Sequence, residues 1–124
     1  MIRPLLISLM LAVGVPSIAA AISTDRDEHL MSCDVLVAPS FRYSGMCLVR
    51  RSGTTEIVYL LTTRTVSQQI PEYFFYLYHD QDKFAFWNNE PFASHAHDSI
   101  GVFELTDNCY EGQQFRICKA PLWE

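Results

Sequence analysis

From Cys33 onward the sequence consists of short runs rich in β-branched and aromatic residues, separated by turn residues. No stretch places apolar residues at helical spacing over three turns, which argues against a helix bundle. The clearest strand pair is 46–51 and 55–63, because Ser52-Gly53 between them can form a hairpin turn. A second hairpin is predicted from 73–79 and 83–87. The pattern predicts an all-β fold, a small antiparallel β-sandwich or partly closed barrel of about six to eight strands with at most one short N-terminal helix.

The first 21 residues have the pattern of an export signal. Arg3 gives a positive start, an apolar stretch covers 5–15, and small residues stand at 19–21. That stretch is shorter than the roughly 20 residues that a membrane-spanning helix needs. We therefore expect a signal peptide over 1–21, an N-terminal arm over 22–32 and a single domain over 33–124. The protein is predicted to be secreted or periplasmic, without stable membrane insertion once the signal is removed.

All four cysteines of the chain lie after the predicted signal. An even number of cysteines in an oxidising compartment indicates two disulfide bonds, for which sequence alone permits three pairings. We favour Cys33 with Cys47 and Cys109 with Cys118, because turn residues inside each segment can return the chain as a hairpin. Neither pair has the C-x₂-C spacing of zinc ligands, so a structural zinc site is not predicted.

The charge of the chain restricts its partners. Nine Lys and Arg residues stand against 14 Asp and Glu, a formal net charge of −5, and removal of Arg3 with the signal would make it more negative. The longest basic cluster is Arg50-Arg51. The chain therefore lacks the positive surface on which binding to a phosphate backbone depends, and nucleic acid is excluded as a partner. Its acidity favours another exported protein as the partner, and a basic one in particular.

The segment Ser94-His95-Ala96-His97-Asp98 is the one cluster that suggests metal chemistry. In extended backbone His95 and His97 would point to the same face and could hold zinc or copper. Two ligands do not complete a site, and no spacing indicates where further ligands would come from. We interpret the cluster as a solvated loop and predict no cofactor, with a periplasmic metal-handling protein as the alternative.

No catalytic residues are predicted. His97, Asp98 and Ser99 are the residue types of a hydrolase triad, but neighbours on one strand point apart, and no Gly-x-Ser-x-Gly elbow is present. The cysteines are expected to be oxidised, which removes them as nucleophiles. The sequence therefore favours a protein that is not an enzyme, although a small hydrolase with a site assembled only in three dimensions stays open.

The aromatic residues of the second hairpin have two interpretations. Both faces of this hairpin could be buried, or one face could present Tyr76, Tyr78 and Trp87 to a partner. The favoured function is an exported binding or inhibitor-type module that acts by protein–protein surface complementarity. Small exported inhibitors of cell-wall hydrolases have this general make-up, but no motif transfers their residues to this chain, so no family is assigned. The residues predicted to be buried inside strands are Tyr59, Phe75, Leu77, Phe86 and Phe103.

Overall fold

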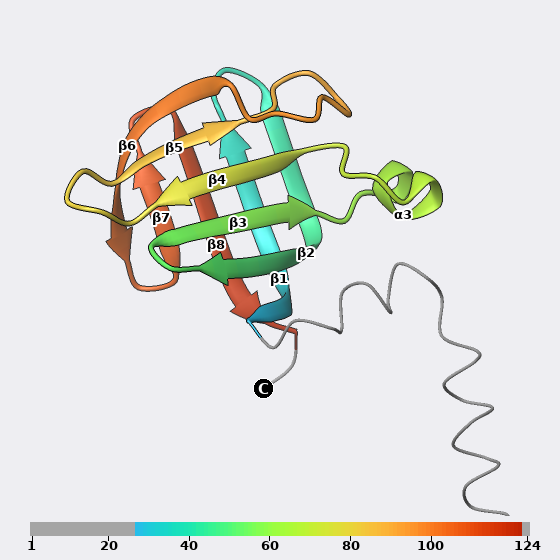
Figure 1. Cartoon of the computed structure of the whole chain (residues 1–124), viewed down its shortest axis with the longest axis horizontal. Coiled ribbons are helices and arrows are strands. Elements are labelled where there is room, and N and C mark those ends of the chain that lie inside the picture. The colour runs from blue at the N-terminus through green and yellow to red at the C-terminus, as the bar shows by residue number, and fades with distance from the viewer. Residues whose placement is uncertain (1–26, 123–124) are drawn as a thin grey trace, which may run out of the picture.

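The chain forms a closed antiparallel β-barrel in a computed structural model that describes residues 27–122 (Figure 1). Each strand pairs with the next along the chain, and β8 returns to pair with β1. The predicted all-β antiparallel fold is confirmed, with eight strands and full closure. The strands are β1 (Glu28–Val37), β2 (Phe41–Ser52), β3 (Thr55–Leu60), β4 (Phe74–Tyr78), β5 (Phe84–Trp87), β6 (Asp98–Thr106), β7 (Cys109–Gly112) and β8 (Phe115–Pro121).

The one helix of the described residues, α3 (Thr63–Gln68), lies in the connection between β3 and β4. Thr62 caps its start, where the hydroxyl oxygen accepts a hydrogen bond from the Thr65 amide at 3.0 Å. Gln69 ends it in the left-handed conformation, with φ of 61°. The sequence placed a short helix, if any, in the N-terminal arm and extended the strand to residue 63. The cap at Thr62 explains why the strand ends earlier, at Leu60.

Strand β1 begins at Glu28, so residues 28–32 belong to the barrel and the predicted arm over 22–32 is wrong for this part. Glu28 pairs with Arg50 of β2, and Met31 pairs with Pro121 of β8. Polar residues here indicated an arm, but the strand accommodates them: the Glu28 carboxylate forms an ion pair with Arg50 of β2. The rest of the predicted arm and the predicted signal peptide lie outside the described residues. No helix within 27–122 is long and apolar enough to cross a membrane.

Both predicted disulfides are present. Cys33–Cys47 joins β1 to β2 inside the barrel, with Cα atoms 5.9 Å apart. Cys109 and Cys118 are direct partners in the register of β7 and β8, with Cα atoms 4.0 Å apart. Each bond therefore links two neighbouring strands, in agreement with the predicted local hairpins.

The core consists of the inward-facing residues of all eight strands. Of the residues predicted to be buried, Phe75, Leu77 and Phe103 are in this core, each less than 5% exposed. Tyr59 and Phe86 are not: both lie on the outer surface and are partly exposed. Their neighbours along the strands occupy the inward positions, because successive side chains of a strand point to opposite faces.

The two ends of the barrel differ. At the closed end, where β1 finishes and β2 starts, the Phe41 ring lies 4.7 Å from that of Tyr73 and 4.9 Å from that of Trp87, between centroids. At the open end, where β3 starts and β8 finishes, Glu56 and Lys119 point inward instead. An eight-stranded barrel is just wide enough for side chains to fill it or for one small ligand to enter.

Candidate functional site

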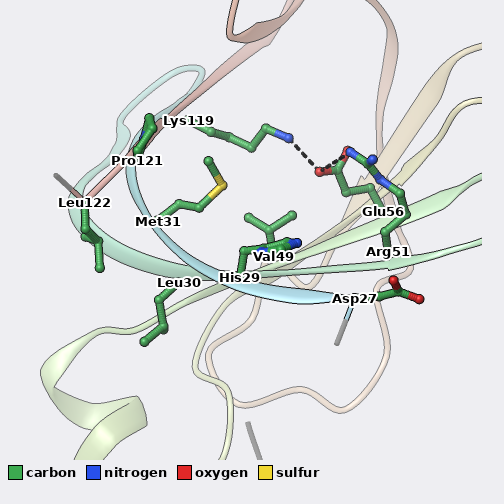
Figure 2. A pocket seen from close by; sticks show the side chains of 10 residues that line it. All are labelled: Asp27, His29, Leu30, Met31, Val49, Arg51, Glu56, Lys119, Pro121 and Leu122. Atoms are coloured by element: carbon green, nitrogen blue, oxygen red, sulfur yellow. Dashed lines mark hydrogen bonds and ion pairs between the residues drawn. The ribbon is translucent and has the colours of Figure 1, made fainter. Parts of the chain in front are cut away.

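A cavity of about 550 Å³ opens at the open end of the barrel (Figure 2). It combines apolar side chains with a group of charged ones, the composition typical of ligand pockets, and its volume lies within their usual range of roughly 300–1,000 Å³. The first and last strands and the β2–β3 hairpin supply its walls. The lining residues are Asp27, His29, Leu30, Met31, Val49, Arg51, Glu56, Lys119, Pro121 and Leu122.

The floor of the cavity is built around Glu56, which is fully buried (0% exposed). Lys119 Nζ donates hydrogen bonds to Glu56 Oε2 and to the Tyr110 hydroxyl oxygen, both at 2.6 Å. The Tyr110 hydroxyl in turn donates to Glu56 Oε1. His79 Nε2 lies 3.1 Å from the same oxygen, and an Arg51 guanidinium nitrogen lies 3.5 Å from Oε2. We call these five residues the Glu56 cluster.

The environment of the cluster fixes its charges. Burial alone would raise the pKa of Glu56, but hydrogen bonds from Lys119 and Tyr110, together with the positive charges of Lys119 and Arg51, lower it below the ordinary value. Burial raises the pKa of Tyr110, and its hydrogen bond to the Glu56 carboxylate raises it further. Glu56 is therefore ionised at neutral pH and Tyr110 keeps its proton. The cluster is therefore a set of fixed charges, in which the Glu56 carboxylate is a weak base.

Sequence reasoning missed this cluster. Glu56 stands in a strand of apolar and aromatic residues. Two of its partners in the cluster are far from it in the sequence: Lys119 by 63 positions and Tyr110 by 54. A signal was available nevertheless. Glu56 has the same parity as Val58 and Leu60, which are buried in the barrel, so alternation along β3 turns Glu56 inward as well.

A second feature is a set of aromatic rings on the outside of the barrel. Neighbouring rings in this set have centroids 5.0 to 6.1 Å apart and so form one connected patch across three adjacent strands. Phe74 is buried and the other rings are partly exposed. We call this set the outer aromatic face. Its members are Tyr59 of β3, Phe74, Tyr76 and Tyr78 of β4, and Phe84 and Phe86 of β5.

The structure divides the residues proposed from sequence for partner binding. Tyr76 and Tyr78 lie on the outer aromatic face. Trp87 does not: it is 5% exposed and stacks against Phe75 in the core at 5.2 Å. The proposal for Trp87 is thus corrected, because it follows Phe86 directly in β5 and the two side chains point to opposite faces of the strand.

An acidic hollow of about 440 Å³ adjoins the outer aromatic face at the turn between β4 and β5. Asp80, Gln81, Asp82 and Phe84 line it, and both aspartates are exposed. Phe84 also belongs to the outer aromatic face, where its ring stacks on that of Tyr78 at 5.0 Å. Aromatic surface and negative charge are therefore contiguous on this side of the barrel.

His95 and His97 lie together in the loop between β5 and β6. Both are exposed, and their rings stack with centroids 5.2 Å apart. Within 27–122 no group of three or more His, Cys, Asp or Glu residues is placed to hold a metal ion. The adjacent Asp98 carboxylate accepts a hydrogen bond from the Asn89 amide at 3.2 Å. The structure thus brings the two predicted ligands together without assembling a larger ligand set among the described residues.

Comparison with known proteins yields no match: no protein-family model, no curated protein and no solved structure matches this chain.

Proposed function

We propose that this chain is an exported binding module that docks a basic segment of a partner protein on the outer aromatic face. The observation that carries the proposal is the contact between this face and the acidic hollow. Tyr78 stacks on Phe84, and Phe84 lines the hollow together with Asp82. A partner side chain with an apolar stem and a positive charge could place the stem against these rings and the charge near Asp82.

The chemistry of the face suits Arg and Lys. Their hydrocarbon stems pack on aromatic rings while the charged group stays close to carboxylates and water. A guanidinium or ammonium placed over a ring gains a further cation–π attraction. The same arrangement occurs within the chain, since the Arg50 guanidinium carbon lies 5.4 Å from the Tyr59 ring centroid. The net charge of −5 would also steer a basic partner toward the protein.

Export is part of the proposal. The signal pattern over 1–21 supports it, and so do the two disulfides, because such bonds persist mainly in oxidising compartments. The encounter with the partner would then occur in the periplasm or outside the cell.

Titration calorimetry with synthetic peptides tests the proposal. A short peptide that alternates arginine and leucine is expected to bind, whereas its counterpart with glutamate in place of arginine is not. Tyr78→Ser removes a central ring, and Asp82→Asn removes a charge from the hollow. Each substitution should weaken binding of the arginine peptide by about tenfold or more, the loss that corresponds to about 1.4 kcal/mol.

Matched controls lie on other parts of the surface. Leu36→Ser removes an exposed apolar side chain from the outside of β1, and Asp107→Asn removes an exposed aspartate from the turn between β6 and β7. Both should leave peptide binding unchanged. Equal binding of the two peptides, or equal losses in the control and test variants, would refute the outer aromatic face as the docking surface.

A further inference from the structure

We propose that the cavity at the open end is a separate binding site for a small amphipathic anion, a molecule with one carboxylate-like head and a hydrocarbon body. This inference does not depend on the outer aromatic face. It follows from three properties of the cavity: the charge at its floor, the availability of Arg51, and the apolar side chains around it.

The floor carries more positive than negative charge. Arg51 and Lys119 both reach the Glu56 carboxylate, at 3.5 Å and 2.6 Å, so two cations converge on one anion. Figure 2 shows Lys119 approaching Glu56 from one side and Arg51 from the other. Because the lowered pKa keeps Glu56 ionised, its charge offsets one of the two cations, and an anionic ligand head would offset the other.

Arg51 is the group best placed to receive that head. Its side chain is 66% exposed, compared with 16% for Lys119. Among residues 27–122 its one side-chain ion pair is the 3.5 Å contact with Glu56, which leaves most of its five N–H donors directed elsewhere. A guanidinium binds a carboxylate through two parallel hydrogen bonds, a geometry that a neutral or cationic head cannot reproduce.

The apolar side chains would receive the body of the ligand. Met31 and Val49 line the cavity beside the cluster, and Pro121 and Leu122 line it from the end of β8 (Figure 2). A hydrocarbon chain removed from water gains roughly 25 cal/mol for each Å² that it buries against such a surface. One cavity of about 550 Å³ therefore offers positive charge to the head and an apolar surface to the body.

Two further polar residues, Asp27 and His29, line the cavity. Asp27 carries a negative charge, and Figure 2 shows its carboxylate apart from the Glu56 cluster. His29 comes from the start of β1 and is exposed. We place the anionic head between Arg51 and Lys119, the two cations that reach Glu56.

Calorimetric titration of the purified protein with decanoate tests the site. Three comparison compounds separate the contributions of head and body: decan-1-ol has a neutral head, decyltrimethylammonium has a cationic head, and butanoate keeps the carboxylate but lacks most of the chain. We expect one-to-one binding of decanoate that is about tenfold or more tighter than binding of each comparison compound.

Substitutions locate the binding. Arg51→Gln should weaken decanoate binding by about tenfold, and Arg51→Lys should restore part of the affinity because it keeps the charge but not the bidentate geometry. Arg42→Gln is the matched control, since Arg42 is an exposed arginine on the outside of the same strand. It should leave binding unchanged. Arg51 is exposed, so folding of its variants is expected and circular dichroism verifies it.

Several results would overturn the inference: absence of decanoate binding, equal affinity for decan-1-ol, tighter binding of decyltrimethylammonium, or an Arg51→Gln variant with unchanged affinity. Tyr78→Ser separates this site from the proposed function. If that variant lost decanoate binding while Arg51→Gln kept it, the anion would lie on the outer aromatic face. The inference about the cavity would then be wrong, although the peptide-docking proposal would be unaffected.

Discussion

The two ends of the barrel share the same strand geometry but carry different kinds of inward side chains. At the closed end, inward positions carry the rings of Phe41, Tyr73 and Trp87, which pack against one another with centroids 4.7 to 5.9 Å apart. At the open end, the corresponding inward positions carry Glu56 and Lys119, with a cavity above them. The difference shows that closure of the sheet fixes which side chains point inward, whereas their chemistry decides whether an end becomes core or site.

The ends also differ in the kind of stabilisation that they provide. Ring packing at the closed end removes apolar surface from water and does not depend on pH. The Glu56 cluster must instead recover the cost of burying a carboxylate, and it does so through hydrogen bonds and charges from several strands. Perturbations of the two ends should therefore differ in size and in their response to pH.

The largest effect is expected for Phe75→Ala. Phe75 is fully buried and stacks on Trp87 toward the closed end, so its removal should lower the free energy of unfolding by about 3–5 kcal/mol. Chemical denaturation measures this change. Phe86→Ala, on the partly exposed outer aromatic face, is the matched control and should cost less than half as much. Equal costs would show that the outer rings are as important for packing as the core.

Removal of the Cys109–Cys118 bond should have the next largest effect. Its two cysteines directly precede Tyr110 and Lys119 in β7 and β8, so the bond braces two members of the Glu56 cluster. The double substitution to alanine should cost about 3 kcal/mol in the chain-entropy model. Peptide mapping without reduction provides the check on the pairing, since a peptide that joins Cys33 or Cys47 to either C-terminal cysteine would contradict it.

Glu56→Gln probes the open end directly. Glutamine keeps the shape of the side chain but removes the charge that Lys119 and Arg51 face, and it should cost about 1.5–3 kcal/mol. Denaturation at neutral pH measures this loss. A stabilised variant would mean that desolvation of the carboxylate outweighs its interactions, so that the cluster is maintained at the expense of stability.

The apolar core could be predicted from the sequence more completely than the Glu56 cluster. Burial of Phe75, Leu77 and Phe103 was predicted because an apolar residue inside a strand-like run carries its own signal. Glu56 carries none unless the parity of β3 is known, and its partners come from strands that meet only when the barrel closes. Both disulfides were predictable because each joins neighbouring strands through a short segment with a turn.

The errors on the aromatic hairpin have the same origin. Alternation was evident in the sequence, but which parity faces inward was not. Trp87 was therefore placed on the candidate binding face, and Phe86 was predicted to be buried, whereas Trp87 is buried and Phe86 is partly exposed. The register of β4 against β5 puts Phe75 and Trp87 on one face and Tyr76 and Phe86 on the other, and closure of the barrel decides which of these faces is inside. Only long-range pairing therefore settles which residues form the outer aromatic face.

Lowering the pH should reduce the free energy of unfolding gradually and by a smaller amount, through Glu56 at the open end. The pKa of Glu56 in the folded protein is lower than in the unfolded chain, where it is about 4.3, so the unfolded state takes up a proton first as pH falls. The stabilisation from Glu56 is thus complete above that value and is lost as pH falls through the folded pKa. Denaturation curves between neutral and acid pH should show a decline that is shallower in Glu56→Gln. Identical declines in both proteins would assign acid sensitivity to other carboxylates.

The smallest effect is expected for His95 and His97, which lie at the closed end. This pair contrasts with the Glu56 cluster at the open end. His95 and His97 are exposed and have no third ligand among residues 27–122, whereas each Glu56 oxygen has two side-chain partners. Calorimetry with zinc and with copper at neutral pH should therefore detect binding no tighter than that of any two adjacent imidazoles, and His95→Ala should leave stability unchanged. A real site would bind more weakly in acid, because its ligands must lose their protons first. A stoichiometric submicromolar complex that disappears in both His95→Ala and His97→Ala would identify a metal centre at the closed end and support a metal-handling role.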